Sequence, residues 1–169
     1  MSLDSSYLPI AVTGFETDPS RKCEGGTPFI LHTTRGDLRV AYHEASSSRG
    51  GVVWVYGAWG GLDGPAGGIY PVLAEELVAE GLASLRVDYR HPGNIAESVS
   101  DTLAGVSFLN SKACHNVALV GHSFGGAVVI GAAPLSLDVK AVVALSSQTA
   151  GARNASLVSP RPLLLVHGE

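Results

Sequence analysis

Charged side chains are scarce in this 169-residue sequence, since Asp, Glu, Lys and Arg together make up 15% of it and the formal net charge is −4. With so little positive charge, we expect no electrostatic attraction to nucleic acid or to an anionic membrane. No apolar run is long enough to span a bilayer. Residues 1–6 have neither the basic nor the apolar region of a secretory signal, so a cytoplasmic protein is expected.

Cysteine is also rare, and the chain contains two of these residues. Cys23 and Cys114 lie far apart in the sequence and lack the spacing of metal ligands. We therefore expect two free thiols in a reducing compartment and no bound metal.

Apolar residues, in contrast, are abundant at 46% of the sequence, and the length is sufficient for one domain with a buried core. Residues 1–26 are interpreted as an N-terminal extension or early edge strands. Residues 27–169 are interpreted as the domain itself. Two strand-like segments, 29–32 and 38–42, flank Arg35-Gly36-Asp37 and predict an N-terminal hairpin.

From residue 52 onward, short apolar segments typical of buried strands alternate with segments typical of helices. A capping-box spacing of Asn94 and Glu97 predicts the start of one helix. The predicted strands are 52–56, 82–87, 117–120, 141–145 and 163–166, and the other two predicted helices are 69–80 and 124–133. This alternation predicts an α/β protein with a three-layer, doubly wound, mostly parallel sheet that is covered by helices on both faces.

The segment Gly121-His122-Ser123-Phe124-Gly125 has the pattern G-x-S-x-G and lies between a predicted strand and a predicted helix. Glycines leave room for a sharp turn at that junction, and the turn pushes the serine hydroxyl out beside a helix N-terminus. Ser123 is therefore the candidate catalytic nucleophile. The alternatives are a glycine-rich phosphate-binding turn or a serine that serves only packing.

Residues 29–169 resemble the α/β-hydrolase superfamily in four segments, which are "VALVGHSFGG", "VVWVYGAWGG", "ASLRVDYR" and "PLLLVHGE". The uncapped, dienelactone-hydrolase-like or small-esterase branch is the most similar, because residues 146–162 are too few for a helical lid. The resemblance implies that strand 52–56 lies beside strand 117–120. It also implies a cofactor-independent serine hydrolase that cleaves an ester or thioester bond of a small acyl substrate.

The resemblance also implies an oxyanion hole formed by two backbone N–H groups. One belongs to Phe124, and the other to Ala58, with its neighbour Trp59 as an alternative donor. Tyr56-Gly57 stands where the family has a His-Gly pair. The same glycine-rich loop has neither the Gly-Lys-Ser/Thr ending nor the G-x-G-x-x-G spacing of a nucleotide-binding loop.

The activating residues of the serine are harder to find. The resemblance implies an acid two residues beyond the position of Glu169 and a histidine after one further strand, so the chain as given looks C-terminally truncated. Within the sequence, His91 follows a central strand and is a candidate surrogate base, His122 is a candidate supporting residue, and Glu169 is an alternative acid. Asp88 is interpreted as a hydrogen-bonded loop anchor.

Two functional classes therefore stay open, a serine hydrolase and a non-catalytic binding protein of the same fold. A nucleotide-binding α/β domain is a third alternative. Strand 163–166 has no charged residue, and an uncovered strand of this kind can pair with another chain. This edge predicts self-association into a homo-oligomer.

Overall fold

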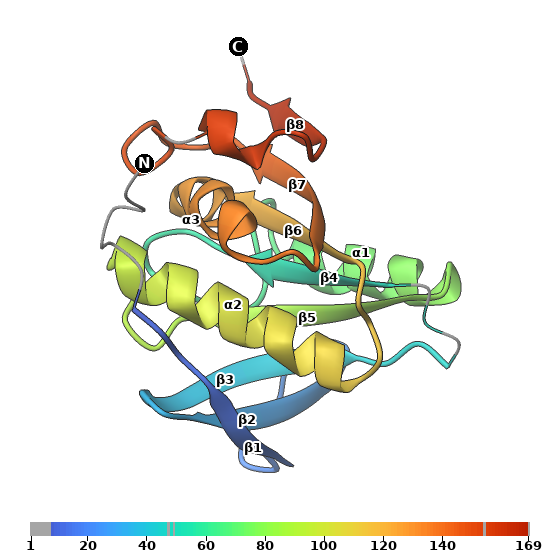
Figure 1. Cartoon of the computed structure of the whole chain (residues 1–169). Helices are drawn as coiled ribbons and strands as arrows, with labels where there is room; N and C mark the ends of the chain where they lie inside the picture. Colours follow the sequence, from blue (N-terminus) through green and yellow to red (C-terminus); the bar gives the residue numbers. More distant parts are fainter. Residues whose placement is uncertain (1–7, 47, 49, 154, 169) are drawn as a thin grey trace.

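A single eight-stranded sheet forms the centre of the molecule in the computed structural model, which describes residues 8–46, 48, 50–153 and 155–168 (Figure 1). In spatial order its strands are β1 (Val12–Thr17), β2 (Thr27–Thr33), β3 (Gly36–His43), β5 (Leu82–Asp88), β4 (Gly50–Val55), β6 (Val117–His122), β7 (Val139–Leu145) and β8 (Leu163–Val166). The pairs from β1 to β5 are antiparallel, and those from β5 to β8 are parallel. The mostly parallel sheet and the β2–β3 hairpin confirm the predicted fold class.

Helices cover both faces of the sheet. Figure 1 shows α2 (Ile95–Ser111) and α3 (Phe124–Ala132) on one face and α1 (Ile69–Ala79) on the other. Two short 3-10 helices, η1 (Ala133–Leu135) and η2 (Ala155–Val158), follow α3 and β7. The side chain of Asn94 accepts a hydrogen bond from the Glu97 backbone N–H at 3.2 Å, which confirms the predicted start of α2.

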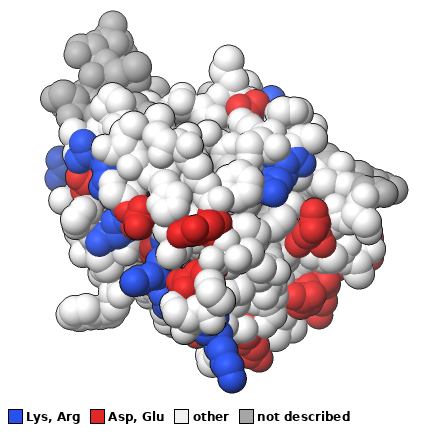
Figure 2. Space-filling view, turned by 90° about the horizontal axis from the view of Figure 1, so that it is seen from below, with Lys and Arg blue, Asp and Glu red and all other residues white. Residues whose placement is uncertain are grey.

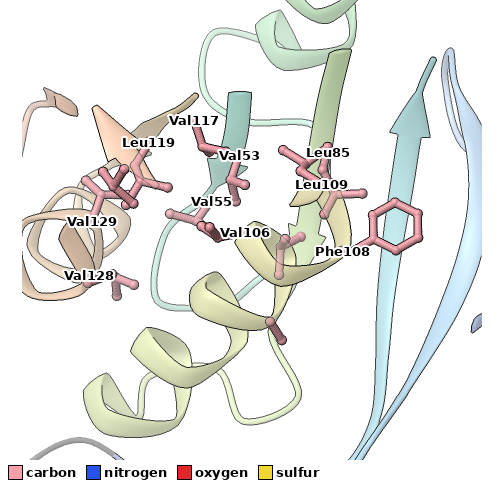
Figure 3. Packing of buried hydrophobic residues seen from close by; sticks show 14 of the residues in the cluster. Val53, Val55, Leu85, Val106, Phe108, Leu109, Val117, Leu119, Val128 and Val129 are labelled. Atoms are coloured by element: carbon pink, nitrogen blue, oxygen red, sulfur yellow. The ribbon is translucent and has the colours of Figure 1, made fainter. Parts of the chain in front are cut away.

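The core lies mainly between the sheet and the α2–α3 layer. Figure 3 shows Val53 and Val55 of β4 pointing toward Val106 of α2, with Val128 and Val129 of α3 nearby. The alternate residues of β4, Val52 and Trp54, face α1 and form a second, smaller cluster there. Because successive side chains of a strand point to opposite faces, β4 is buried on both sides and consists almost entirely of apolar residues.

The position of β4 determines where a site can form. Parallel pairing of β4 with β5 on one side and with β6 on the other brings the carboxyl ends of these strands to one edge of the sheet. From that edge the chain leaves β4 toward α1 on one face and leaves β6 toward α3 on the opposite face. In open α/β sheets, ligands commonly bind at the carboxyl ends of the strands where the loops diverge in this way.

The far edge of the sheet is formed by β8, whose large apolar side chains are exposed. Leu164, Leu165 and Val166 have exposed fractions of 56%, 62% and 47%. Pairing of this edge with a second copy of the chain stays a prediction.

Within the described residues, no helix is both long enough and apolar enough to cross a membrane.

Candidate active site

Ser123 is the one residue between the end of β6 and the start of α3, and its backbone is strained. Its φ and ψ angles are 56° and −116°. Residues other than glycine rarely adopt this backbone conformation, and keeping such a residue in it costs about 1–3 kcal/mol. The turn is held by hydrogen bonds from the Ser123 N–H to the Leu145 carbonyl at 2.9 Å and from the Gly126 and Gln148 N–H groups to the Ser123 carbonyl at 3.1 and 3.2 Å.

The glycines around Ser123 are required by close backbone approach. A Cβ atom on Gly121 would lie 2.1 Å from the Gly125 carbonyl oxygen, and one on Gly125 would lie 2.3 Å from the Tyr56 carbonyl oxygen. Real Cβ atoms do not approach an oxygen so closely, so larger residues would push β4, β6 and α3 apart. The local sequence thus allows the helix to begin immediately after the serine.

The loop after β4 packs directly on this turn. The ring of Tyr56 stacks on His122, with centroids 5.5 Å apart and an interplanar angle of 31°. The Tyr89 hydroxyl donates to the Tyr56 carbonyl at 3.3 Å, and the Tyr70 hydroxyl donates to the Val55 carbonyl at 3.0 Å. Burial raises the pKa of both tyrosines, so their hydroxyls stay protonated donors.

Two polar residues of β5 hold the next part of this loop. Asp88 accepts a hydrogen bond from the Gly61 N–H at 2.8 Å and forms an ion pair with Arg21 at 3.1 Å. The fully buried Arg86 donates from Nη1 to the Leu62 carbonyl at 3.2 Å. Asp88 is therefore the loop anchor expected from the sequence, whereas the role of Arg86 was missed because sequence patterns do not report a buried cation.

Three backbone N–H groups, in the loop after β4 and in the first turn of α3, have no hydrogen-bond partner within the described part of the chain. The N–H groups of Ala58, Trp59 and Phe124 donate to no acceptor among the described residues. Phe124 lies in the first turn of α3, where N–H groups have no partner within the helix. Ala58 and Trp59 are exposed and belong to the loop that follows β4.

None of the described histidines forms a hydrogen bond to Ser123. His122, the expected supporting residue, packs on Tyr56, and its Nδ1 is buried without a partner in the described part of the chain. Burial lowers the pKa of His122. His91, the candidate surrogate base, is exposed in the loop after β5, and its carbonyl accepts from the Asn94 N–H at 3.1 Å. Glu169 lies outside the described residues.

A polar pocket of about 330 Å³ lies between the β2–β3 hairpin and the loop after β5. It is lined by Arg35, Gly36, Asp37, Arg39, Asp88, Tyr89, Arg90 and His91. Its arginines are mostly neutralised, since Arg35 pairs with Glu97 and Arg90 pairs with Asp101. Figure 2 shows basic and acidic side chains interspersed on the face seen from below. The pocket is therefore not a strongly positive site.

Among the described residues, no group of three or more His, Cys, Asp and Glu side chains could hold a metal ion.

Comparison with known proteins identifies the architecture. Neither a protein-family model nor a curated protein matches the chain. Solved structures do match, among them an α/β serine hydrolase homologue from Coxiella burnetii, with a TM-score of 0.68 and 20% identity over 88% of this chain and 76% of that one. The chain has the α/β-hydrolase fold.

Two further α/β-hydrolase-fold structures show how much of each protein is matched. The dienelactone hydrolase from Anabaena variabilis has a TM-score of 0.67 and 22% identity over 78% of this chain and 68% of that one. The α/β hydrolase GrgF from Penicillium sp. has a TM-score of 0.58 and 18% identity over 83% of this chain and 46% of that one. The chain thus spans less than half of the length of GrgF.

Proposed function

We propose that the protein is a serine hydrolase in which Ser123 attacks the carbonyl carbon of an ester or thioester in a small acyl substrate. The observation that carries this proposal is the strained backbone of Ser123, with φ at 56° between β6 and α3. A glycine would adopt this conformation without strain, so a serine there suggests that its side chain is needed. The α/β-hydrolase fold and the position of Ser123 at the carboxyl ends of β4 and β6 support the same assignment.

The unpartnered N–H groups suit the charge that such a reaction develops. Attack on an acyl group places negative charge on the carbonyl oxygen, and N–H donors already aimed at that oxygen stabilise the transition state. We assign this role to the N–H groups of Phe124 and Ala58, with Trp59 as the alternative to Ala58. The N-terminal end of α3 adds a favourable dipole at the same position.

The reaction also needs a base for the proton of the serine hydroxyl. In the proposed sequence the Ser123 Oγ bonds to the acyl carbon as a base takes its proton, and the alcohol or thiol leaves with that proton. Water then hydrolyses the acyl-enzyme. His91 stays the candidate base within the described residues, although it forms no hydrogen bond there to Ser123.

Labelling with a fluorophosphonate tests the nucleophile. We expect covalent modification of Ser123, detected by peptide mass spectrometry, and its loss in Ser123→Ala. Ser147→Ala is the matched control, because Ser147 is a half-buried serine in the loop that packs on the same turn. Equal labelling of wild type and Ser123→Ala would refute the assignment.

The absence of a described histidine bonded to Ser123 favours a second candidate, a binding protein that retains the fold without turnover. It predicts that ester ligands bind beside Ser123 while Ser123 is neither labelled nor acylated. Incubation with p-nitrophenyl acetate separates the two candidates, because a hydrolase releases p-nitrophenolate faster than the Ser123→Ala variant does.

A further inference from the structure

Trp59 is the most exposed of the large hydrophobic residues among those described, at 96% of its surface. The other tryptophan, Trp54, is 4% exposed and packs under α1. An indole ring that is fully in water contributes nothing to the core. Its position is informative because Trp59 lies in the loop after β4, next to Ala58, the proposed oxyanion donor.

The backbone around Trp59 is held while its ring is left free. The Gly60 N–H donates to the Gly57 carbonyl at 3.0 Å, which closes a tight turn around Ala58 and Trp59. The following residue, Gly61, is fixed to Asp88 through its N–H at 2.8 Å. Gly60 itself is buried against the Asp88 and Pro92 side chains. The turn therefore presents the indole outward from a fixed base.

This turn and Ser123 lie at the same edge of the sheet. The turn begins at the end of β4, the strand that pairs with β6, and Tyr56 packs on His122 immediately before Ser123. The segment from Tyr56 to Leu62 contains no charged residue. A substrate group that meets Trp59 therefore meets an uncharged, glycine-rich surface with one large aromatic ring.

We propose that Trp59 is the specificity residue of the site and that it stacks on an aromatic acyl group of the substrate. This inference rests on the proposed function for its claim that the ligand is an ester. A planar ring stacks on an open indole face with more contact than a flexible alkyl chain of similar size, and aromatic pairs gain stability beyond the area they bury. Uncharged esters of aromatic carboxylic acids are thus the favoured substrate class.

Binding is measured in a Ser123→Ala background, which prevents turnover of the ligand. Methyl benzoate is the aromatic probe, and methyl butyrate is the aliphatic comparison. We expect methyl benzoate to quench the emission of the exposed tryptophan. Trp59→Ala should weaken methyl benzoate binding about five-fold, equivalent to roughly 1 kcal/mol, as measured by ligand-observed NMR titration. Trp59→Phe should keep the affinity within about two-fold because a ring remains.

Leu137→Ala is the control for loss of an exposed apolar side chain, since Leu137 is 85% exposed and precedes β7 at its amino end. This substitution should leave the affinity unchanged. Equal binding of the two esters, or unchanged methyl benzoate affinity in Trp59→Ala, would overturn the inference. Failure of Ser123 labelling together with intact, Trp59-dependent binding would instead overturn the hydrolase assignment and leave the aromatic subsite standing.

Discussion

Replacement of Gly125 by alanine tests whether close backbone packing at the serine turn holds β4 and α3 together. The new Cβ would lie 2.3 Å from the Tyr56 carbonyl oxygen and 2.8 Å from the Val55 carbonyl oxygen. Both contacts are to backbone, so a side-chain rotation cannot relieve them. Relief requires α3 to move by about 1 Å from the end of β4, and overpacking of this kind costs about 3 kcal/mol.

That cost is large compared with the total stability of a domain, which is about 5–15 kcal/mol. With a urea m-value of about 2 kcal/mol/M, the unfolding midpoint of Gly125→Ala should fall by about 1.5 M. The same movement shifts the Phe124 N–H relative to the loop after β4, so fluorophosphonate labelling of Ser123 should slow as well.

Gly131→Ala is the matched control in the same helix. Its Cβ would lie 3.4 Å from Cγ2 of Val99, an ordinary van der Waals contact with a side chain. Alanine is favoured over glycine within a helix by about 1 kcal/mol, so this variant should be as stable as wild type or slightly more stable. Equal unfolding midpoints for Gly125→Ala and Gly131→Ala would refute the argument from backbone contact.

Two further predictions concern the loop anchor and pH. Asp88→Ala removes the acceptor of the Gly61 N–H, so hydrogen exchange at the Gly61 amide should accelerate about ten-fold or more. Asp88→Asn keeps an acceptor oxygen, so its Gly61 amide should exchange nearly as fast as in wild type. Unchanged exchange in Asp88→Ala would contradict the role of Asp88 as loop anchor. Burial lowers the pKa of His122 below its ordinary value of 6.5, so the unfolded chain takes up the proton more readily, and stability should be lost as the pH falls from about 7 toward the folded-state pKa. His122→Phe keeps a ring against Tyr56, and on going from pH 7.5 to pH 5.5 it should lose less stability in urea unfolding than wild type does. An unaltered pH dependence would count against this role.

Much of the fold could be predicted from residue patterns because the strands are short apolar segments with clear ends. The predicted helix 124–133 ends one residue early, at Ala132, and strand 82–87 extends to Asp88. Differences of this size are normal, since helix and strand ends fray and depend on local hydrogen bonds. The pairing of β4 with β6 was expected from the family resemblance rather than from any pattern within the strands.

The sequence by itself determined the position of Ser123 at a strand–helix junction, because G-x-S-x-G is a local pattern and its glycines are required by contacts close to the turn. It also determined that the neighbouring strands are buried, because apolar content is a property of each segment. Only the tertiary structure decided which groups surround the serine. Arg86 and Asp88 of β5 hold the loop from β4, and the Gln148 N–H donates to the Ser123 carbonyl, although the two partners of each hydrogen bond lie far apart along the chain. Such contacts arise from the order of strands in the sheet, which brings distant loops to one edge, and no local sequence pattern encodes that order.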